Sequence, residues 1–165
     1  MDTIAAIKSR TSIRKYKPEA IPRETLMEIV DCGRMAPTGY NDQPWVFVVV
    51  TDPRTRGRIA ENTKYGKFIA DAGACIAVFG DKKGRTMLED ACAATENMII
   101  ASQSLSLGSC WVNSHKTEHS EFVESLLKCP EDHELVTLLA IGVPNEERKT
   151  VKKELSKVLR WNSFS

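Results

Sequence analysis

The sequence lacks the long apolar run that a membrane-spanning helix requires. Its apolar stretches are much shorter than the roughly 20 residues that cross a bilayer, and the longest have the length of single strands. The first residues, Met1 to Ile4, also lack a basic flank followed by an apolar block, so we expect no signal peptide and a cytoplasmic location. A net charge of +1 over 165 residues predicts no general attraction to nucleic acid or to anionic membranes.

Paired cysteines are also missing. The chain has five cysteines, an odd number, and no two of them form the C-x-x-C spacing. Most lie within apolar stretches, which argues against a disulfide framework and against a zinc site. We expect small buried thiols in a reducing compartment.

Several motifs of nucleotide binding and catalysis are absent as well. The sequence has neither G-x-G-x-x-G nor G-x-x-x-x-G-K-[ST], which argues against a Rossmann dinucleotide site and against a P-loop. No serine stands in a G-x-S-x-G elbow, and no two carboxylates are placed as a general acid and base. If the protein is an enzyme, we therefore expect a cofactor, and not side chains, to carry the hard chemistry.

Two histidines have the spacing of a zinc-binding helix without its other residues. His115 and His119 are four apart, but Lys116 stands where H-E-x-x-H has its glutamate. The surrounding stretch, residues 113–120, is very polar. We expect it to be the solvated start of a helix.

Apolar periodicity predicts one layered domain over residues 1–165, with neither internal repeat nor linker. We expect helices over 3–9, 22–36, 86–107 and 120–127 and from Asp52 onward, and strands over 45–50, 73–79, 109–112 and 134–143. The run Trp45–Val50 is unbroken β-branched and aromatic, as in a strand buried on both faces. Strands separated by helices fit an α/β or an α+β architecture, and the pattern leaves the strand directions open.

The longest predicted helix, 86–107, is apolar or weakly polar around most of its circumference. One face carries Leu88, Ala91, Cys92, Thr95, Ile99, Ser102 and Leu105, and a second side carries Ala94, Met98 and Ala101. A helix of this kind is usually buried on more than one side. A subunit interface is a natural place to bury the second side.

A basic segment follows the first helix. Arg10, Ser12 and Arg14 alternate along it, so an extended backbone would direct their side chains to one side. Two guanidinium groups and a hydroxyl would suit a phosphate. Taken alone, a solvated basic turn is the commoner meaning of such a segment.

A loop bounded by two prolines, Pro37–Pro44, offers neutral hydrogen-bonding groups. Thr38, Asn41 and Gln43 can both donate and accept, and Gly39 leaves the backbone accessible. This set suits the amide-rich edge of a heterocycle. An ordinary helix-to-strand loop explains it equally well.

These segments together resemble the flavin-binding nitroreductase family. The resemblance rests on Arg10-x-Ser12-x-Arg14, on the run Ala36 to Trp45, on Leu107 to Val112 after the long helix, and on Ile141-Gly142-Val143-Pro144 with a basic segment after it. It covers nearly the whole chain in the right order. Each piece is weak, but the ordered set is specific.

The resemblance implies an α+β, nitroreductase-like layered fold, in which helices flank a mostly antiparallel sheet. It also implies an intertwined homodimer, with helix 86–107 at its centre and two FMN sites at the interface. The implied cofactor-binding residues are Arg10, Thr11, Ser12, Arg14, Pro37, Thr38, Gly39, Asn41, Gln43, Asn113, Ser114, Lys149 and Lys152. Those of the loop after the second helix come from the other subunit, Asn113 and Ser114 lie near flavin N5, and one of the two lysines completes the phosphate clamp.

The implied activity is that of an FMN-dependent NAD(P)H oxidoreductase with ping-pong kinetics. NADH or NADPH would pass hydride to flavin N5, and a nitroaromatic, quinone or similar small acceptor would then receive it. Thr11 and Tyr40 depart from the residues common in the family, and the region from Gly66 to Asp90 has no room for extra helices over the pocket. An FMN carrier or redox sensor with little turnover is the alternative, and an interaction domain without a cofactor is a weaker one.

Overall fold

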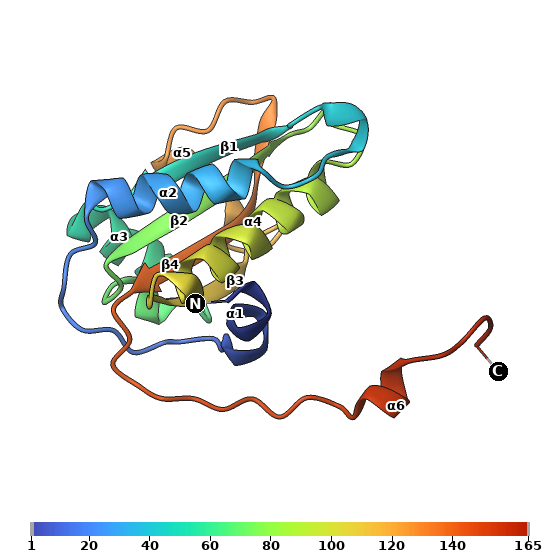
Figure 1. Cartoon of the computed structure of the whole chain (residues 1–165). Helices are drawn as coiled ribbons and strands as arrows, with labels where there is room; N and C mark the ends of the chain where they lie inside the picture. Colours follow the sequence, from blue (N-terminus) through green and yellow to red (C-terminus); the bar gives the residue numbers. More distant parts are fainter. Residues whose placement is uncertain (1, 165) are drawn as a thin grey trace.

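A four-stranded antiparallel sheet in the order β1-β2-β4-β3 forms the centre of the molecule. The structure of the protein is a computed structural model, and it describes residues 2–164 (Figure 1). Helices cover both faces of the sheet, which confirms the predicted α+β layered fold. The elements are α1 (Thr3–Ser9), α2 (Arg23–Arg34), the 3₁₀ turn η1 (Gly39–Asn41), β1 (Trp45–Val50), α3 (Pro53–Asn62), η2 (Lys67–Ile69), β2 (Ala74–Asp81), α4 (Met87–Ser104), β3 (Gly108–Asn113), α5 (Ser120–Leu126), β4 (His133–Gly142) and α6 (Leu155–Val158).

The two faces of the sheet bury separate apolar clusters. Alternation along β2 directs Ile76 and Val78 toward α2 and α4, and Cys75 and Ala77 toward α3, η2 and α5. The central strands β2 and β4 are almost entirely buried because neighbouring strands and helices surround them.

Strand β1 is not buried on both faces, so the expectation for Trp45–Val50 was wrong in this respect. Val46 is 48% exposed and Val49 is 38% exposed. The strand lies at the edge of the sheet, where it pairs only with β2. β-branched residues favour the extended backbone whether or not a second layer covers them, so composition indicated the strand and not its burial.

Helix α4 is buried on both of the sides expected, and it departs from the expectation at its two ends. Ala94 and Met98, expected on the second side, are fully buried, whereas Leu88 and Leu105 of the expected core face are 38% and 44% exposed. A Cβ at Gly33 of α2 would lie 2.7 Å from Met98 Cγ, so this glycine permits the close approach. The helix also ends at Ser104, before a turn in which Ser106 has a φ of 62°.

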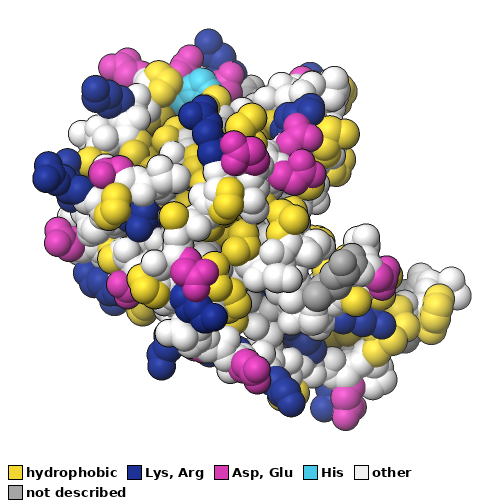
Figure 2. Space-filling view, turned by 60° about the vertical axis from the view of Figure 1, so that its left-hand side comes forward, with side chains coloured by type: hydrophobic (Ala, Val, Ile, Leu, Met, Phe, Trp, Pro, Cys, Tyr) yellow, Lys and Arg dark blue, Asp and Glu magenta, His cyan; other side chains and the backbone are white. Residues whose placement is uncertain are grey.

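The chain leaves β4 as an arm that extends away from the sheet (Figure 1). Residues 147–164 are exposed throughout, and they include Val151, Leu155, Val158, Trp161 and Phe164. Figure 2 shows hydrophobic side chains along this arm, which stands apart from the rest of the molecule. The arm therefore carries large exposed apolar side chains.

Within residues 2–164, no helix has the length and apolar character needed to cross a membrane. The five cysteines are free thiols. Cys75 and Cys110 are buried, and Cys32, Cys92 and Cys129 are partly buried. The described part of the chain holds no cluster of three or more potential metal ligands among His, Cys, Asp and Glu side chains.

Candidate functional site

The segment after α1 is extended and lies along β3. Ser12 forms a parallel bridge with Ser109, and the amide of Ile13 donates to the Ser109 carbonyl at 2.9 Å. Ile13 is buried, and a Cβ at Gly108 would lie 2.8 Å from Ile13 Cβ. Because neighbouring residues of an extended chain point to opposite sides, Ser12 and Arg14 lie on the side away from this core.

A second segment, at the end of β4, fixes the first in place. The carboxylate of Glu146 accepts from the amides of Arg14 and Lys15, at 2.6 and 3.2 Å. These hydrogen bonds, the one from Arg14 first, hold the pKa of Glu146 below its usual value. Tyr16 is buried, and its hydroxyl donates to the Ile13 carbonyl at 2.6 Å. The basic segment is therefore built into the fold and is not a solvated turn.

Three arginines and one serine hydroxyl influence the buried thiol of Cys110. Burial raises the pKa of this thiol, whereas the charges of Arg14, Arg148 and Arg10 and a hydrogen bond with Ser12 lower it. The structure thus brings together the predicted residues Arg10, Ser12 and Arg14. It adds Arg148, which the sequence analysis missed inside the basic stretch after Pro144.

The other predicted contributors to a phosphate clamp lie farther along the chain. Lys149 and Lys152 are exposed residues of the arm. Thr11 is half-buried beside Ser12 and has no charge to add.

Two hollows adjoin the arginine cluster and share Trp111. The smaller, about 140 Å³, is lined by Arg10, Ser12, Glu96, Ile99, Ser109 and Trp111. The larger, about 820 Å³, is lined by Arg14, Lys64, Tyr65, Phe68, Cys110, Trp111, Val112, Asn113, Lys116, Thr117, Glu118 and His119. Together they form a cationic and aromatic surface that could hold an anionic group at one end and a planar ring beside it.

Lys64 and Tyr65 are further residues that the sequence analysis missed. They lie between α3 and η2, and Lys64 Nζ is 5.4 Å from the centre of the Tyr65 ring. Arg14 lies 5.8 Å from the ring of Phe68, at the same hollow. No motif marks these residues, because the fold alone brings this connection beside the end of β3.

The turn after β3 is more buried than expected. Ser114, His119 and Ser120 are buried, so the expectation of a solvated helix start over residues 113–120 was wrong. The polar side chains of this turn form hydrogen bonds within the turn itself. The Ser114 hydroxyl donates to the Val112 carbonyl at 3.1 Å, which leaves its oxygen to accept from His119 Nε2 at 3.0 Å. Burial lowers the pKa of His119 below 6.5.

Asn113 and Ser114 differ in what they offer to a ligand. Asn113 is exposed and lines the larger hollow. Ser114 is buried, and its amide already donates to the Val136 carbonyl at 3.2 Å. Ser114 therefore fixes the turn, and Asn113 is the residue of the two that a ligand can reach.

The loop after α2 is attached to the first turn of α4. The Gly39 amide donates to Asp90 Oδ1 at 3.3 Å, and the Thr86 hydroxyl donates to Asp90 Oδ2 at 2.9 Å. A Cβ at Gly39 would lie 2.5 Å from Thr86 Oγ1, so only glycine fits there. The Arg85 guanidinium lies 3.9 Å from the ring of Tyr40, which has a φ of 57°. Pro37 precedes the loop and is exposed.

The polar side chains of this loop are held by local bonds. The Gln43 amide N–H donates to Thr38 Oγ1 and its side chain donates to the Asn41 carbonyl, both at 3.3 Å. The side-chain amide of Asn41 makes no hydrogen bond to any residue from 2 to 164. It is therefore free to contact a ligand.

One chain does not bring this loop to the arginine cluster. The loop contacts Asp90, whereas Arg10 and Ser12 lie by Glu96 and Ile99, and Ser9 accepts from Gln103 at 3.2 Å. At 1.5 Å per residue, Asp90 is about 9 Å from Glu96 and about 20 Å from Gln103 along the axis of α4. The loop lies at the first turn of α4, whereas Arg10 and Ser12 lie beside its middle.

Comparison with known proteins identifies the family. The nitroreductase family model matches residues 7–65 and 60–143. The chain belongs to the nitroreductase family. A protein of Archaeoglobus fulgidus assigned as an NADH dehydrogenase/NAD(P)H nitroreductase is 30% identical over 153 residues, which cover 89% of this chain and 88% of that one.

Two solved structures share the fold over almost the full length. An FMN-dependent nitroreductase of Clostridium difficile has a TM-score of 0.91 and 28% identity, covering 98% of this chain and 99% of that chain. A Desulfovibrio desulfuricans protein described as a nitroreductase, solved in complex with FMN, has a TM-score of 0.84 and 30% identity, covering 100% and 99%. The predicted family and fold are confirmed.

Proposed function

We propose that this nitroreductase-family protein binds FMN and transfers hydride from NADH or NADPH to a small organic acceptor. The observation that carries the proposal is that Arg10 and Ser12 line one hollow and Arg14 lines the adjoining aromatic hollow of about 820 Å³, with Arg148 close enough to influence the same thiol, Cys110. Forked guanidinium donors and a hydroxyl suit a phosphate, and the hollow has the size of a cofactor pocket. The donor set therefore fits FMN.

The proposed roles follow from position. Arg10, Ser12, Arg14 and Arg148 would hold the phosphate, with Lys149 or Lys152 as further contributors from the arm. Asn113 would contact the flavin ring, and Ser114 would hold Asn113 in position. The positive charge of Lys64 and Arg14 would stabilise an anionic reduced ring. FMN supplies the hydride chemistry when bound, so no protein nucleophile is required.

We propose that the site is completed by a second copy of the chain. The loop that carries Thr38, Gly39, Asn41 and Gln43 is attached to the first turn of α4, whereas Arg10 and Ser12 lie beside the middle of this helix. The partner's copy of this loop would supply them in an intertwined homodimer. The exposed Leu88 and Leu105 on α4 and the apolar arm support such an interface, since both leave apolar surface uncovered.

The proposed acceptors are nitroaromatics, quinones and similar small molecules, reduced in a ping-pong cycle. The chain from Gly66 to Asp90 contains η2, β2 and the start of α4 and no further helix that could cover the hollow. Tyr65 is 78% exposed at its rim and could stack on an aromatic acceptor. We propose an open pocket with broad acceptor use, in a single-domain cytoplasmic enzyme.

The visible spectrum of the purified protein, followed by anaerobic titration with NADH and with NADPH, tests the proposal. The enzyme should be yellow and should bleach rapidly with at least one nicotinamide. Bleaching slower than minutes would favour an FMN carrier or redox sensor. A colourless protein that fails to take up added FMN would overturn the proposal.

A further inference from the structure

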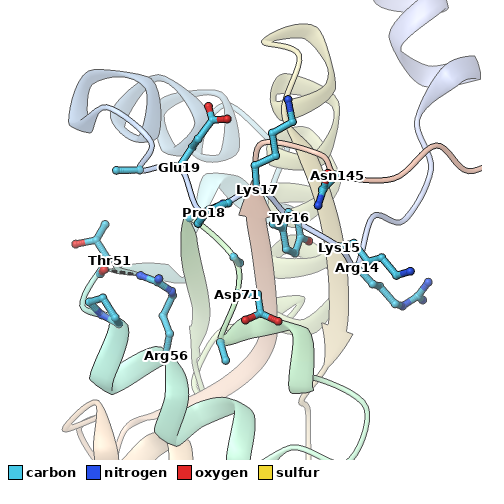
Figure 3. Close-up of a pocket in the computed structure, with 15 residues that line it drawn as sticks. Arg14, Lys15, Tyr16, Lys17, Pro18, Glu19, Thr51, Arg56, Asp71 and Asn145 are labelled. Carbon is cyan, nitrogen blue, oxygen red and sulfur yellow. Dashed lines mark hydrogen bonds between the residues drawn. The ribbon is translucent and has the colours of Figure 1, made fainter.

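A separate pocket of about 600 Å³ lies between the start of α3, residues 14–20 and residues 70–73 (Figure 3). It adjoins the proposed FMN site, because Arg14 lines both this pocket and the larger hollow. Figure 3 shows Arg14, Lys15, Arg56 and Asp71 among the residues that line it. Its wall also contains small apolar residues, namely Pro18, Ala20, Pro53, Ala70 and Ala72.

The notable residue in this pocket is Arg56, which is only 8% exposed. Its Nη1 donates to the Thr51 carbonyl, and its Nε is buried without a hydrogen-bond partner among the described residues. Nη2 makes no hydrogen bond to these residues either, so its donors remain available. Among residues 2–164, no carboxylate lies within 4.0 Å of this side chain.

The neighbouring groups do not neutralise this cation. Cys75 is fully buried and its pKa is raised to about 12, so its thiol is uncharged at neutral pH. Asp52 favours the charged form of Arg56, but its carboxylate is exposed and accepts from the amide and hydroxyl of Thr55 at 2.7 and 2.6 Å. Burial is the largest influence, and it lowers the pKa of Arg56.

A buried cation without a counter-charge is costly unless an anion is supplied from outside. The planar guanidinium matches a carboxylate. The pocket is lined by Arg14, Lys15 and Lys17 as well as by Glu19 and Asp71, so the preference for a carboxylate rests on the planar guanidinium and the apolar wall. We infer that this pocket binds a small organic carboxylate, with Arg56 as its anchor and the apolar wall around its body.

The test uses propionate and its neutral isostere propionamide, with the FMN-saturated protein at constant ionic strength. The buried Arg56 Nε–H gives a side-chain ¹H–¹⁵N NMR signal. This signal is assigned to Arg56 because it is missing from the spectrum of Arg56→Met. Propionate should shift this signal saturably and propionamide should not. The exposed residue Arg54 of the same helix is the control, because Arg54→Met should leave the shift unchanged.

Thermal unfolding separates this binding role from a purely structural one. Without ligand, Arg56→Met should melt at the temperature of the parent protein or above it, because the variant removes an uncompensated buried charge. Propionate should raise the melting temperature of the parent and of Arg54→Met, but not that of Arg56→Met. A parent that shows no propionate shift, or binds inorganic phosphate more tightly than propionate, would overturn the inference.

Discussion

The amide of Gly39 donates to Asp90 Oδ1 at 3.3 Å and thereby fixes the loop after α2 to the first turn of α4. The other oxygen of this buried carboxylate accepts from the Thr86 hydroxyl at 2.9 Å. If this loop contacts the FMN of a partner subunit, Asp90 positions the loop without touching the cofactor itself.

Replacement of Asp90 should therefore weaken FMN binding from a distance. In Asp90→Ala the loop loses its attachment, and we expect the Kd for FMN to rise on the order of tenfold, corresponding to about 1.4 kcal/mol. Quenching of flavin fluorescence on binding measures the Kd. The exposed neighbour Glu89 is the control, and an equal effect of Glu89→Ala would contradict the role of Asp90.

Arg10→Ala and Arg148→Ala should each weaken FMN binding by removing a guanidinium from the cluster around Cys110. Loss of a charge-assisted hydrogen bond costs about 1.5–3 kcal/mol, so we expect the Kd to rise roughly tenfold to a hundredfold. Lys149→Ala is the matched comparison and should have a smaller effect. If Lys149→Ala weakened binding more than Arg148→Ala, the clamp proposed from the structure would be wrong.

His119 should make stability depend on pH in the acid range. Burial lowers its folded pKa below 6.5, so the unfolded chain takes up a proton more readily. Its contribution to stability is therefore complete above pH 6.5 and is lost as the pH falls from there through the lowered pKa. Urea unfolding of the parent and of His119→Gln at pH 7.5 and at lower pH measures this difference. An identical pH slope in both proteins would count against it.

Two glycines in helices should respond oppositely to alanine. A Cβ at Gly33 would lie 2.7 Å from Met98 Cγ, so Gly33→Ala should cost about 1–3 kcal/mol by overpacking. Gly57 in α3 has no atom within 4 Å of a Cβ, so Gly57→Ala should stabilise by about 0.5–1 kcal/mol. Denaturant unfolding measures both. A stabilised Gly33→Ala would show that α2 and α4 pack less closely than described.

The sequence predicted features that depend on neighbours along the chain. The four strands and the helices lie within a few residues of the predicted ranges, because apolar periodicity and β-branched runs act locally. The extended course of Arg10, Ser12 and Arg14 was predicted for the same reason. The order of the motifs was sufficient to indicate the family.

Features that depend on packing could not be predicted. The exposure of β1 follows from its place at the sheet edge, and the close approach of α2 to α4 follows from the packing of Met98 against Gly33. Arg148 lies near the cluster because Glu146, two residues before it, accepts a hydrogen bond from the backbone amide of Arg14. No local sequence pattern specifies this long-range contact. Lys64, Asn113 and the buried His119 line one hollow only because the fold brings them together.

The central claim is that each FMN site takes its arginines from one subunit and its loop from the other. Its most direct test is FMN binding by mixed dimers of Arg10→Ala and Asn41→Ala, purified with a different affinity tag on each chain. A mixed dimer should contain one intact site and one doubly altered site, so it should bind FMN at one site with the parent affinity although both homodimers bind weakly. Mixed dimers without a site of parent affinity would contradict the account, because both groups of residues would then belong to the same chain.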